Sequence, residues 1–265
     1  MSKGSTKYDE KQARITERAY NTPEIAAQRL ATLKLLALRS GEHVLDVGTG
    51  PGLLARDMAQ IVGESGRVDG IDSADAMVAL AGARCGEIPQ IHISSGDAQK
   101  LTYPEASFDA VVCTQVLLYV PQVQTALNEM YRVLKLGGRA VIIETDWRGL
   151  VVNSAYPDIT EKLIQSWDAA VASPQLPPVL EPMLAKAGFH GTTVEAFPVL
   201  LNDFVPHNYA YTMSRSLADY AVKQERLDQG EVRRWLDDLQ KKQEDRAFFF
   251  SISRYLFKAF TPGSR

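Results

Sequence analysis

Short apolar runs alternate with amphipathic stretches through the first half of the chain. Five of these runs have the length and the apolar content of buried strands, and most are followed by a segment with apolar residues at helical spacing. Alternating strands and helices imply right-handed crossovers. The pattern therefore predicts the α/β class, with a Rossmann-like, doubly wound parallel sheet. The predicted strands are His43–Val47, Arg67–Ile71, Gln90–Ser94, Phe108–Cys113 and Arg139–Thr145.

The helices of this half follow from the period of their apolar side chains. An amphipathic helix is predicted from about Thr22 to Leu38, with Pro23 in its first turn, where proline is tolerated. The helix before the fifth strand has one apolar face, and Leu136-Gly137-Gly138 is predicted to cap it. That face consists of Val123, Ala126, Leu127, Met130, Tyr131 and Leu134.

The second half departs from this alternation. Helices are predicted around Leu163 and at Glu181–Ala187, after a proline cluster that interrupts the pattern. Two further strands are predicted at Gly191–Leu201 and Ala247–Phe260. Residues 202–246 between them have apolar stripes at helical spacing and are far more than a hairpin connection needs, so they form an insertion.

These elements divide the chain into three parts. Residues 1–39 form a helical cap, residues 40–201 and 247–265 form the Rossmann-like domain, and residues 202–246 form the helical insertion. We expect the insertion and the cap to cover a bound small molecule as a lid. A dimerisation element, which would make the protein a homodimer, is the alternative for an amphipathic insertion.

Composition and charge narrow the function classes. Of 265 residues, 45% are hydrophobic and 23% charged, which suits one domain with a sizeable core. The formal charge is −3 and the basic residues are dispersed, so a nucleic-acid partner is not expected. No apolar run reaches membrane-spanning length, and the polar first residues do not resemble a secretory signal. The two cysteines and four histidines have no metal-ligand spacing, so a cytoplasmic, metal-independent protein is expected.

A glycine-rich loop after the first strand is the strongest functional signal. Gly48, Gly50 and Gly52 allow a tight turn and a close approach of a ligand to the backbone. A dinucleotide-binding loop has the spacing G-x-G-x-x-G, and here the third glycine comes one position early. Asp46, before the first glycine, would oppose a pyrophosphate but suits a ligand with an ammonium and a sulfonium. A nicotinamide-dependent oxidoreductase is therefore a disfavoured alternative.

Acidic residues also follow the next two strands. Asp72 ends the second strand, where a carboxylate accepts hydrogen bonds from ribose hydroxyls. Asp97 follows the third strand, where a carboxylate accepts from an adenine amine beside the backbone N–H of Ala98. Each acid alone is often a helix cap or a turn residue. Their succession at the carboxyl ends of strands, where open α/β sheets bind ligands, predicts a nucleoside site.

Long motifs in this order resemble the class I S-adenosylmethionine-dependent methyltransferases, in particular the UbiE/Coq5-like small-molecule enzymes. The resemblance covers about Glu42–Asp146 and implies a seven-stranded sheet, mostly parallel, whose last strand is antiparallel. It also implies S-adenosyl-L-methionine as the cofactor. The matching stretches are LDVGTGPG, VDGIDSADAM, SSGDAQKLTYPEASFDAVV and LNEMYRVLKLGGRAVI.

The same resemblance assigns cofactor-binding residues. It implies Asp72 at the ribose, Thr114 near the methionine part, and two further groups around the adenine and the amino acid. The adenine group comprises Ser73, Met77, Asp97 and Ala98, and the amino-acid group comprises Asp46, Gly48, Thr49, Gly50 and Gly52.

Candidates for catalysis are fewer, because a sulfonium methyl is already activated and needs mainly in-line alignment with its acceptor. Tyr119 and Asp146 follow the fourth and fifth strands, and Tyr20 is a candidate to close over the methionine end. Arg29, on the apolar stripe of the first helix, is a candidate partner for the cofactor carboxylate. The alternatives are an aromatic packed under a loop for Tyr119, a turn residue for Asp146, helix packing for Tyr20 and an arginine that snorkels past apolar neighbours for Arg29.

The substrate class follows mainly by exclusion. After the fourth strand the chain has Thr114-Gln115-Val116-Leu117 and lacks the Asn/Asp-Pro-Pro-Tyr/Phe tetrapeptide of enzymes that methylate nucleobase amines or planar amides. A methyltransferase with a small-molecule acceptor is therefore predicted. Two alternatives stay open: a cyclase or pericyclase that uses the same cofactor, and a non-catalytic cofactor-binding protein.

Overall fold

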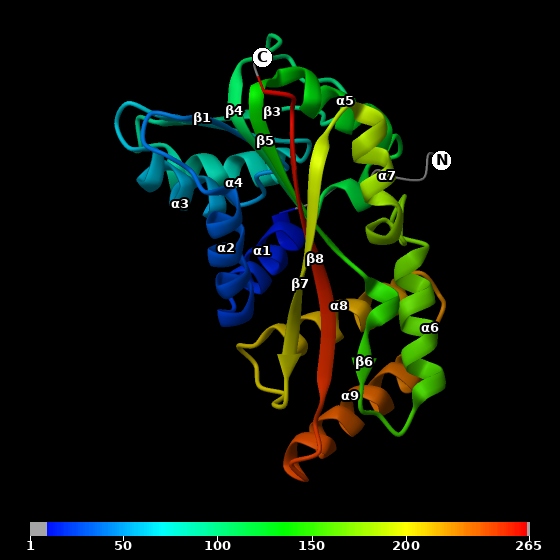
Figure 1. Cartoon of the computed structure of the whole chain (residues 1–265). Coiled ribbons are helices and arrows are strands. Elements are labelled where there is room, and N and C mark those ends of the chain that lie inside the picture. Colours follow the sequence, from blue (N-terminus) through cyan, green and yellow to red (C-terminus); the bar gives the residue numbers. More distant parts are fainter. Residues whose placement is uncertain (1–9, 264–265) are drawn as a thin grey trace.

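The computed structural model describes residues 10–263 and contains one mixed α/β sheet (Figure 1). The strand order is β3-β2-β1-β4-β5-β8-β6, and β7 pairs with β8. Strands β1 to β5 are parallel, while β8 pairs antiparallel with β5, β6 and β7. The strands are β1 His43–Val47, β2 Arg67–Asp72, β3 Ile91–Ser95, β4 Phe108–Thr114, β5 Leu134–Thr145, β6 Val151–Val152, β7 His190–Leu201 and β8 Phe250–Phe260.

Helices cover both faces of this sheet. α5 and α7 pack on one face against a core that includes Leu45, Val111 and Ile142. α2 and α3 pack on the other face, against Val44 and Val112. The helices are α1 Glu10–Tyr20, α2 Pro23–Leu36, α3 Leu53–Val62, α4 Asp75–Cys85, α5 Val123–Val133, α6 Pro157–Asp168, α7 Pro177–Ala187, α8 Tyr209–Lys223 and α9 Gln229–Glu244, with short 3-10 turns η1 Leu117–Tyr119 and η2 Trp147–Gly149.

A third core lies where β8 extends beyond β5 and pairs with β6 and β7. The lower part of β8 in Figure 1 lies among α6, α8 and α9. Trp235 and Leu239 of α9, Leu217 of α8 and Leu163 of α6 are buried there together. The insertion predicted at residues 202–246 thus contains two helices, and Asp228 begins the second with a capping box that includes Glu231.

The α/β class and the mostly parallel, doubly wound sheet are confirmed, and every predicted strand is present. The sheet has an eighth strand, β6, which has only two residues and therefore too short a pattern to detect. α1 lies in the segment predicted as a helical cap, residues 1–39, although its own bounds were not predicted. Residues 1–9 of that segment lie outside the described residues.

Two local predictions are wrong. Gly137 and Gly138 do not cap α5, which ends at Val133, but lie inside β5. There Gly137 has a φ of 72°, near a register shift against β4, and glycine tolerates such a bulge. The helix predicted at Glu181–Ala187 begins earlier, at Pro177, because the first-turn N–H groups of a helix need no intrahelical partner and proline is therefore tolerated there.

Candidate functional site

A pocket lies at the carboxyl ends of β1 and β4, beneath α1 and α2. Six predicted residues line it, and they come from four separate segments of the chain. Side chains from the N-terminal helices therefore meet the glycine-rich loop and the end of β4 in one place. The six are Tyr20, Arg29, Asp46, Gly48, Thr49 and Thr114.

The three glycines of the loop all have positive φ angles, of 72°, 54° and 76°. A Cβ on Gly48 would lie 2.1 Å from a methyl of Val116, and one on Gly52 would lie 3.1 Å from the backbone of Ala81 in α4. At Gly50 the nearest atom is 3.9 Å away, on the ring of Tyr20. Two of the glycines are thus required for packing, while Gly50 leaves the loop open toward the pocket.

Asp72, at the end of β2, joins this loop to the next helix. One carboxylate oxygen accepts a hydrogen bond from the N–H of Gly50 at 2.9 Å, and the other accepts from the N–H of Ala74 at 2.9 Å. Burial raises the pKa of Asp72, and these hydrogen bonds oppose that effect. The side chain is therefore held in place beside the glycine-rich loop.

The other predicted nucleoside residues lie around the ends of β2 and β3. Asp97 is exposed and accepts a hydrogen bond from the N–H of Gln99 at 2.8 Å. Ala98 and Met77 are buried, whereas Ser73 is exposed. The N–H of Gly96 donates to the carbonyl of Asp72 at 3.0 Å, which brings these two strand ends side by side.

Asp46 has the most unusual environment of the loop residues. Its carboxylate is 2% exposed and accepts a hydrogen bond from the hydroxyl of Thr49 at 2.8 Å. Burial raises its pKa to about 7, and the nearby charge of Asp72 adds to the increase. Thr114 adds a buried hydroxyl with no hydrogen-bond partner among the described residues.

Arg29 and Tyr20 reach the pocket from the N-terminal helices. The guanidinium of Arg29 pairs with Asp57 at 3.1 Å through Nε and donates to the carbonyl of Tyr20 at 2.8 Å through Nη1. These two contacts do not involve Nη2. Arg29 thus lies at the pocket with its charge already paired.

The structure does not bring Tyr119 and Asp146 into the pocket lining. Tyr119 ends η1 and packs against the core formed by α6, α8 and α9. Asp146 begins η2, with its backbone N–H bonded to the carbonyl of Ser253 at 3.1 Å. Of the three candidate catalytic residues, only Tyr20 lies at the pocket.

Two polar residues that the motif analysis missed also line the pocket, namely Gln28 and Arg254. Both are buried, and Arg254 donates hydrogen bonds to Oε1 of Gln28 and to the hydroxyl of Tyr209. The sequence contained a signal for Arg254. β8 is an apolar strand in which alternate residues are buried, and Arg254 lies on the same buried face as Phe250 and Ile252.

A buried carboxyl supports the loop that follows β4. Oε1 of Glu144 accepts hydrogen bonds from the N–H groups of Val116 and Leu117, at 3.1 and 2.7 Å. Burial raises the pKa of Glu144 to about 8. Gln115, which precedes these residues, has a φ of 58° and directs Val116 onto Gly48. Glu144 thereby fixes the wall that covers the glycine-rich loop.

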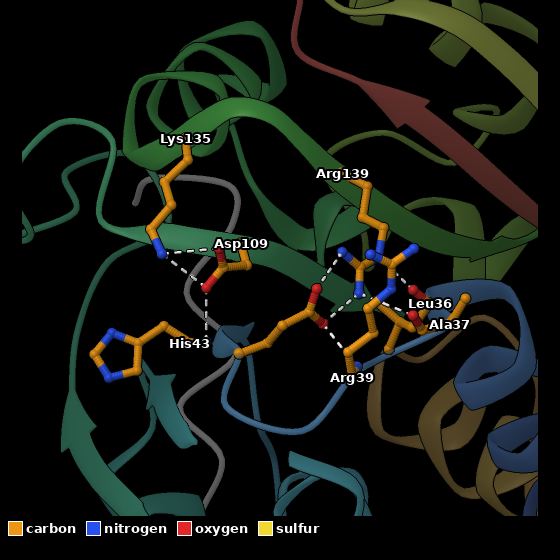
Figure 2. Close-up of polar contacts among 8 residues, drawn as sticks. Leu36, Ala37, Arg39, His43, Asp109, Lys135 and Arg139 are labelled. Atoms are coloured by element: carbon orange, nitrogen blue, oxygen red, sulfur yellow. Dashed lines mark hydrogen bonds and ion pairs between the residues drawn. The ribbon is translucent and has the colours of Figure 1, made fainter. Parts of the chain in front are cut away.

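The amino ends of the strands, on the side of the sheet away from the pocket, have a different arrangement of charges (Figure 2). At the amino ends of the strands, Arg139 pairs with Glu42 at 2.6 Å and Lys135 pairs with Asp109 at 2.8 Å. Burial raises the pKa of both carboxyls, but the hydrogen bonds that each accepts from its cationic partner and from a backbone N–H, together with the nearby positive charge, outweigh burial and keep each pKa below its ordinary value. Carboxylates are therefore paired with cations at the amino ends of the strands, whereas Asp46 at the carboxyl ends has, within the described part of the chain, a hydroxyl as its side-chain partner.

The described residues contain no group of three or more histidine, cysteine, aspartate or glutamate side chains placed to hold a metal ion. Within residues 10–263, no helix combines the length and the apolar character needed to span a membrane.

Comparisons with known proteins show which family the sequence around the site resembles. The family described as "Methyltransferase domain" matches residues 45–142, which include the glycine-rich loop, Asp72, Asp97 and Thr114. An uncharacterized 37.1 kDa protein in transposon TN4556 of Streptomyces fradiae is 32% identical over 237 residues, which cover 86% of this chain and 65% of that protein. The chain thus spans slightly less than two thirds of this relative's length.

Of two further matches, one covers a shorter stretch of the sequence and the other is a solved structure with lower sequence identity. The demethylmenaquinone methyltransferase of Oceanobacillus iheyensis is 37% identical over 125 residues, 46% of this chain and 52% of that enzyme. The structure of Haemonchus contortus phosphoethanolamine N-methyltransferase 2 in complex with S-adenosyl-L-methionine has a TM-score of 0.64 at 21% identity. It covers 97% of this chain and 58% of that one, and a likeness at this identity shows a shared fold.

Proposed function

We propose that the protein transfers the methyl group of S-adenosylmethionine to a small-molecule acceptor, since the methyltransferase domain family matches residues 45–142. One observation carries the proposal. The buried carboxylate of Asp46, the open backbone at Gly50 and the carboxylate of Asp72 meet at the carboxyl ends of neighbouring strands, where α/β sheets bind nucleotides. The resemblance of the sequence to this family is confirmed over the same range.

The residues present fit this cofactor. Asp46 is a carboxylate without a cationic partner and suits the ammonium of the amino-acid part. Thr114 offers a buried hydroxyl that has no partner within residues 10–263, and the loop at Gly50 has room beside the backbone. Each carboxylate oxygen of Asp72 accepts a single backbone bond to Gly50 or Ala74, and a carboxylate has capacity for further bonds from ribose hydroxyls.

The remaining cofactor assignments follow the family pattern. Gly48, Gly52 and Thr49 would shape the loop around the amino-acid part, and Arg29, which lines the pocket, would be a partner for its carboxylate. Ser73, Met77, Asp97 and Ala98, at the ends of β2 and β3, would hold the adenine.

When bound, S-adenosylmethionine supplies an activated methyl group, so the work of this chain is to bind, align and exclude water. Tyr20 covers the loop at Gly50 and is the candidate to close the methionine end. Tyr119 and Asp146 lie outside the pocket lining, so a role for either of them would require an acceptor that extends beyond this pocket. A general base is needed only for acceptors such as phenols or protonated amines.

The acceptor is a small molecule, and neither nucleic acid nor a membrane is part of this proposal. Dispersed basic residues and a net charge of −3 support that choice. The demethylmenaquinone methyltransferase from Oceanobacillus iheyensis aligns with less than half of this chain, so we do not assign its substrate to this protein. A cytoplasmic location and a homodimer stay predictions.

Calorimetry with S-adenosylhomocysteine and NAD tests the cofactor. We expect binding of S-adenosylhomocysteine and no comparable binding of NAD, and the reverse result would contradict the proposal. Incubation with S-adenosylmethionine alone, followed by mass spectrometry, tests the reaction class. Accumulation of methylthioadenosine would indicate cyclisation of the cofactor in place of methyl transfer.

A further inference from the structure

Arg254 is a buried arginine in the wall of the candidate pocket. It lies on β8, opposite Thr145 at the end of β5, and is 2% exposed. The alternation of β8 directs its side chain to the same buried face as Phe250 and Ile252. The fold therefore carries a guanidinium into the place where the glycine-rich loop and α2 meet.

The partners of this guanidinium are all uncharged. Nη1 donates to Oε1 of Gln28, Nη2 donates to the hydroxyl of Tyr209 at 2.9 Å, and the carbon of the guanidinium lies 5.0 Å from the centre of the Tyr209 ring. Nε is buried and has no hydrogen-bond partner among the residues that the structure describes. None of the ion pairs formed within residues 10–263 involves Arg254. A buried cation without an anionic partner is costly, and a ligand anion would offset that cost.

The acids near Arg254 do not fill this role. Glu144 interacts with it only through space, and burial raises the pKa of Glu144 to about 8, so this carboxyl is mostly protonated at neutral pH. Asp46 lines the same pocket, but its carboxylate accepts a hydrogen bond from the hydroxyl of Thr49. Arg29, the other arginine of the pocket, is paired with Asp57. Arg254 is thus the unneutralised positive charge of the pocket lining.

We propose that Arg254 binds a carboxylate group of a ligand held in this pocket. The guanidinium is a planar fork that pairs with carboxylates through two parallel hydrogen bonds, and its free Nε–H is one of the donors for such a pair. Two ligands can supply this group: the amino-acid end of the cofactor and an acidic acceptor. The first source rests on the proposed function, whereas the second requires only that the pocket binds an acid.

The first experiment tests the cofactor as the source. Calorimetry compares S-adenosylhomocysteine with its decarboxylated analogue, which retains the amine. If Arg254 binds the cofactor carboxylate, the unaltered protein prefers S-adenosylhomocysteine by roughly 10–100-fold, the usual range for a hydrogen-bonded charge. Arg254→Met then removes the preference, and Arg254→Lys, which keeps the charge without the fork, restores part of it.

The second experiment tests an acidic acceptor. The protein saturated with S-adenosylhomocysteine is titrated with acetate and benzoate, and with acetamide and benzamide as neutral counterparts. If Arg254 serves the acceptor, a carboxylate binds and its amide does not, and Arg254→Met abolishes the difference without changing the affinity for S-adenosylhomocysteine.

Arg215→Met is the matched control, because Arg215 also stacks on a tyrosine, Tyr211, at 4.5 Å, but is exposed. It should leave both comparisons unchanged. Thermal melting establishes that each variant is folded. If Arg254→Met does not fold, the unaltered protein and Arg254→Lys still give the answer.

The proposal is overturned if the unaltered protein distinguishes neither carboxylate from its neutral counterpart, or if the folded Arg254→Met variant distinguishes them equally well. A protein that fails to bind S-adenosylhomocysteine at all contradicts the proposed function instead. The titration with acetate and benzoate, run without it, then still decides the role of Arg254.

Discussion

The carboxylate of Asp72 accepts a hydrogen bond from the backbone N–H of Gly50 at 2.9 Å, which links the end of β2 to the glycine-rich loop after β1. Asp72→Ala removes this link together with any bond to the ribose. We expect it to weaken the binding of S-adenosylhomocysteine by about 1–3 kcal/mol, as measured by calorimetry, because a hydrogen-bonded charge is lost.

The control for this substitution is Asp75→Ala. Asp75 lies in the first turn of α4, close to Asp72 in the chain, but is exposed. The Asp75→Ala variant should bind S-adenosylhomocysteine with the affinity of the unaltered protein. Unchanged affinity in a folded Asp72→Ala variant would remove Asp72 from the site.

A second prediction concerns the contact between Gly48 and Val116. A Cβ at Gly48 would lie 2.1 Å from Cγ2 of Val116, and the φ of 72° is strained for alanine. Gly48→Ala should therefore lower the free energy of unfolding by about 2–4 kcal/mol in denaturant titrations. Adding Val116→Ala should recover part of this loss, because it removes the overlapping methyl groups.

The helix α4 provides the reference for this pair. A Cβ at Gly82 would meet no atom within 4 Å, and Gly82 is not among the glycines with positive φ. Gly82→Ala should raise the free energy of unfolding by about 0.4–1 kcal/mol. Additive effects of Gly48→Ala and Val116→Ala would show that the predicted overlap does not determine the stability of the loop.

A third prediction follows from the buried carboxyl of Glu144. Its pKa in the folded protein is about 8, against an ordinary value of 4.5, so the folded state holds this proton more tightly. The contribution of Glu144 to stability is therefore greatest below pH 4.5 and falls as the pH rises to about 8. Glu144→Gln cannot ionise and lacks this decrease.

Melting temperatures at pH 5 and pH 9 test this prediction. The melting temperature of Glu144→Gln should rise relative to that of the unaltered protein as the pH rises. Each kcal/mol of stability corresponds to roughly 2–4 °C for a protein of this size. Asp46, whose pKa is also raised, is present in both proteins and cancels from the difference. Parallel curves for the two proteins would show that Glu144 titrates normally.

The glycine-rich loop and Asp72 could be predicted because their signals are local. A strand, three glycines and an acid at the next strand end are close in the sequence, and the parallel sheet brings strand ends together. The pairing of Arg254 with Gln28 was beyond such reasoning, because the two residues are 226 positions apart and come from β8 and α2. The alternation of β8 predicts only that Arg254 points inward, and the antiparallel pairing with β5 decides what it meets.

The last prediction concerns the insertion between β7 and β8, for which the sequence left a lid and a dimerisation element open. The structure describes its helices as part of a core: Trp235 is 1% exposed, and its indole N–H donates to the hydroxyl of Thr160 in α6 at 2.9 Å. Tyr209, at the start of α8, extends this core to Arg254 in the pocket wall.

Trp235→Ala should therefore lower the free energy of unfolding by about 3–5 kcal/mol, as for other large buried aromatics. Arg233→Ala, in the same helix but with a side chain that is 84% exposed, should change it by less than about 0.5 kcal/mol. Light scattering of both variants separates the two roles. A Trp235→Ala variant that loses only a dimeric state, with its melting temperature unchanged, would favour a dimerisation element. A variant that stays in its original oligomeric state but melts earlier and binds S-adenosylhomocysteine more weakly would support a segment that builds the pocket wall.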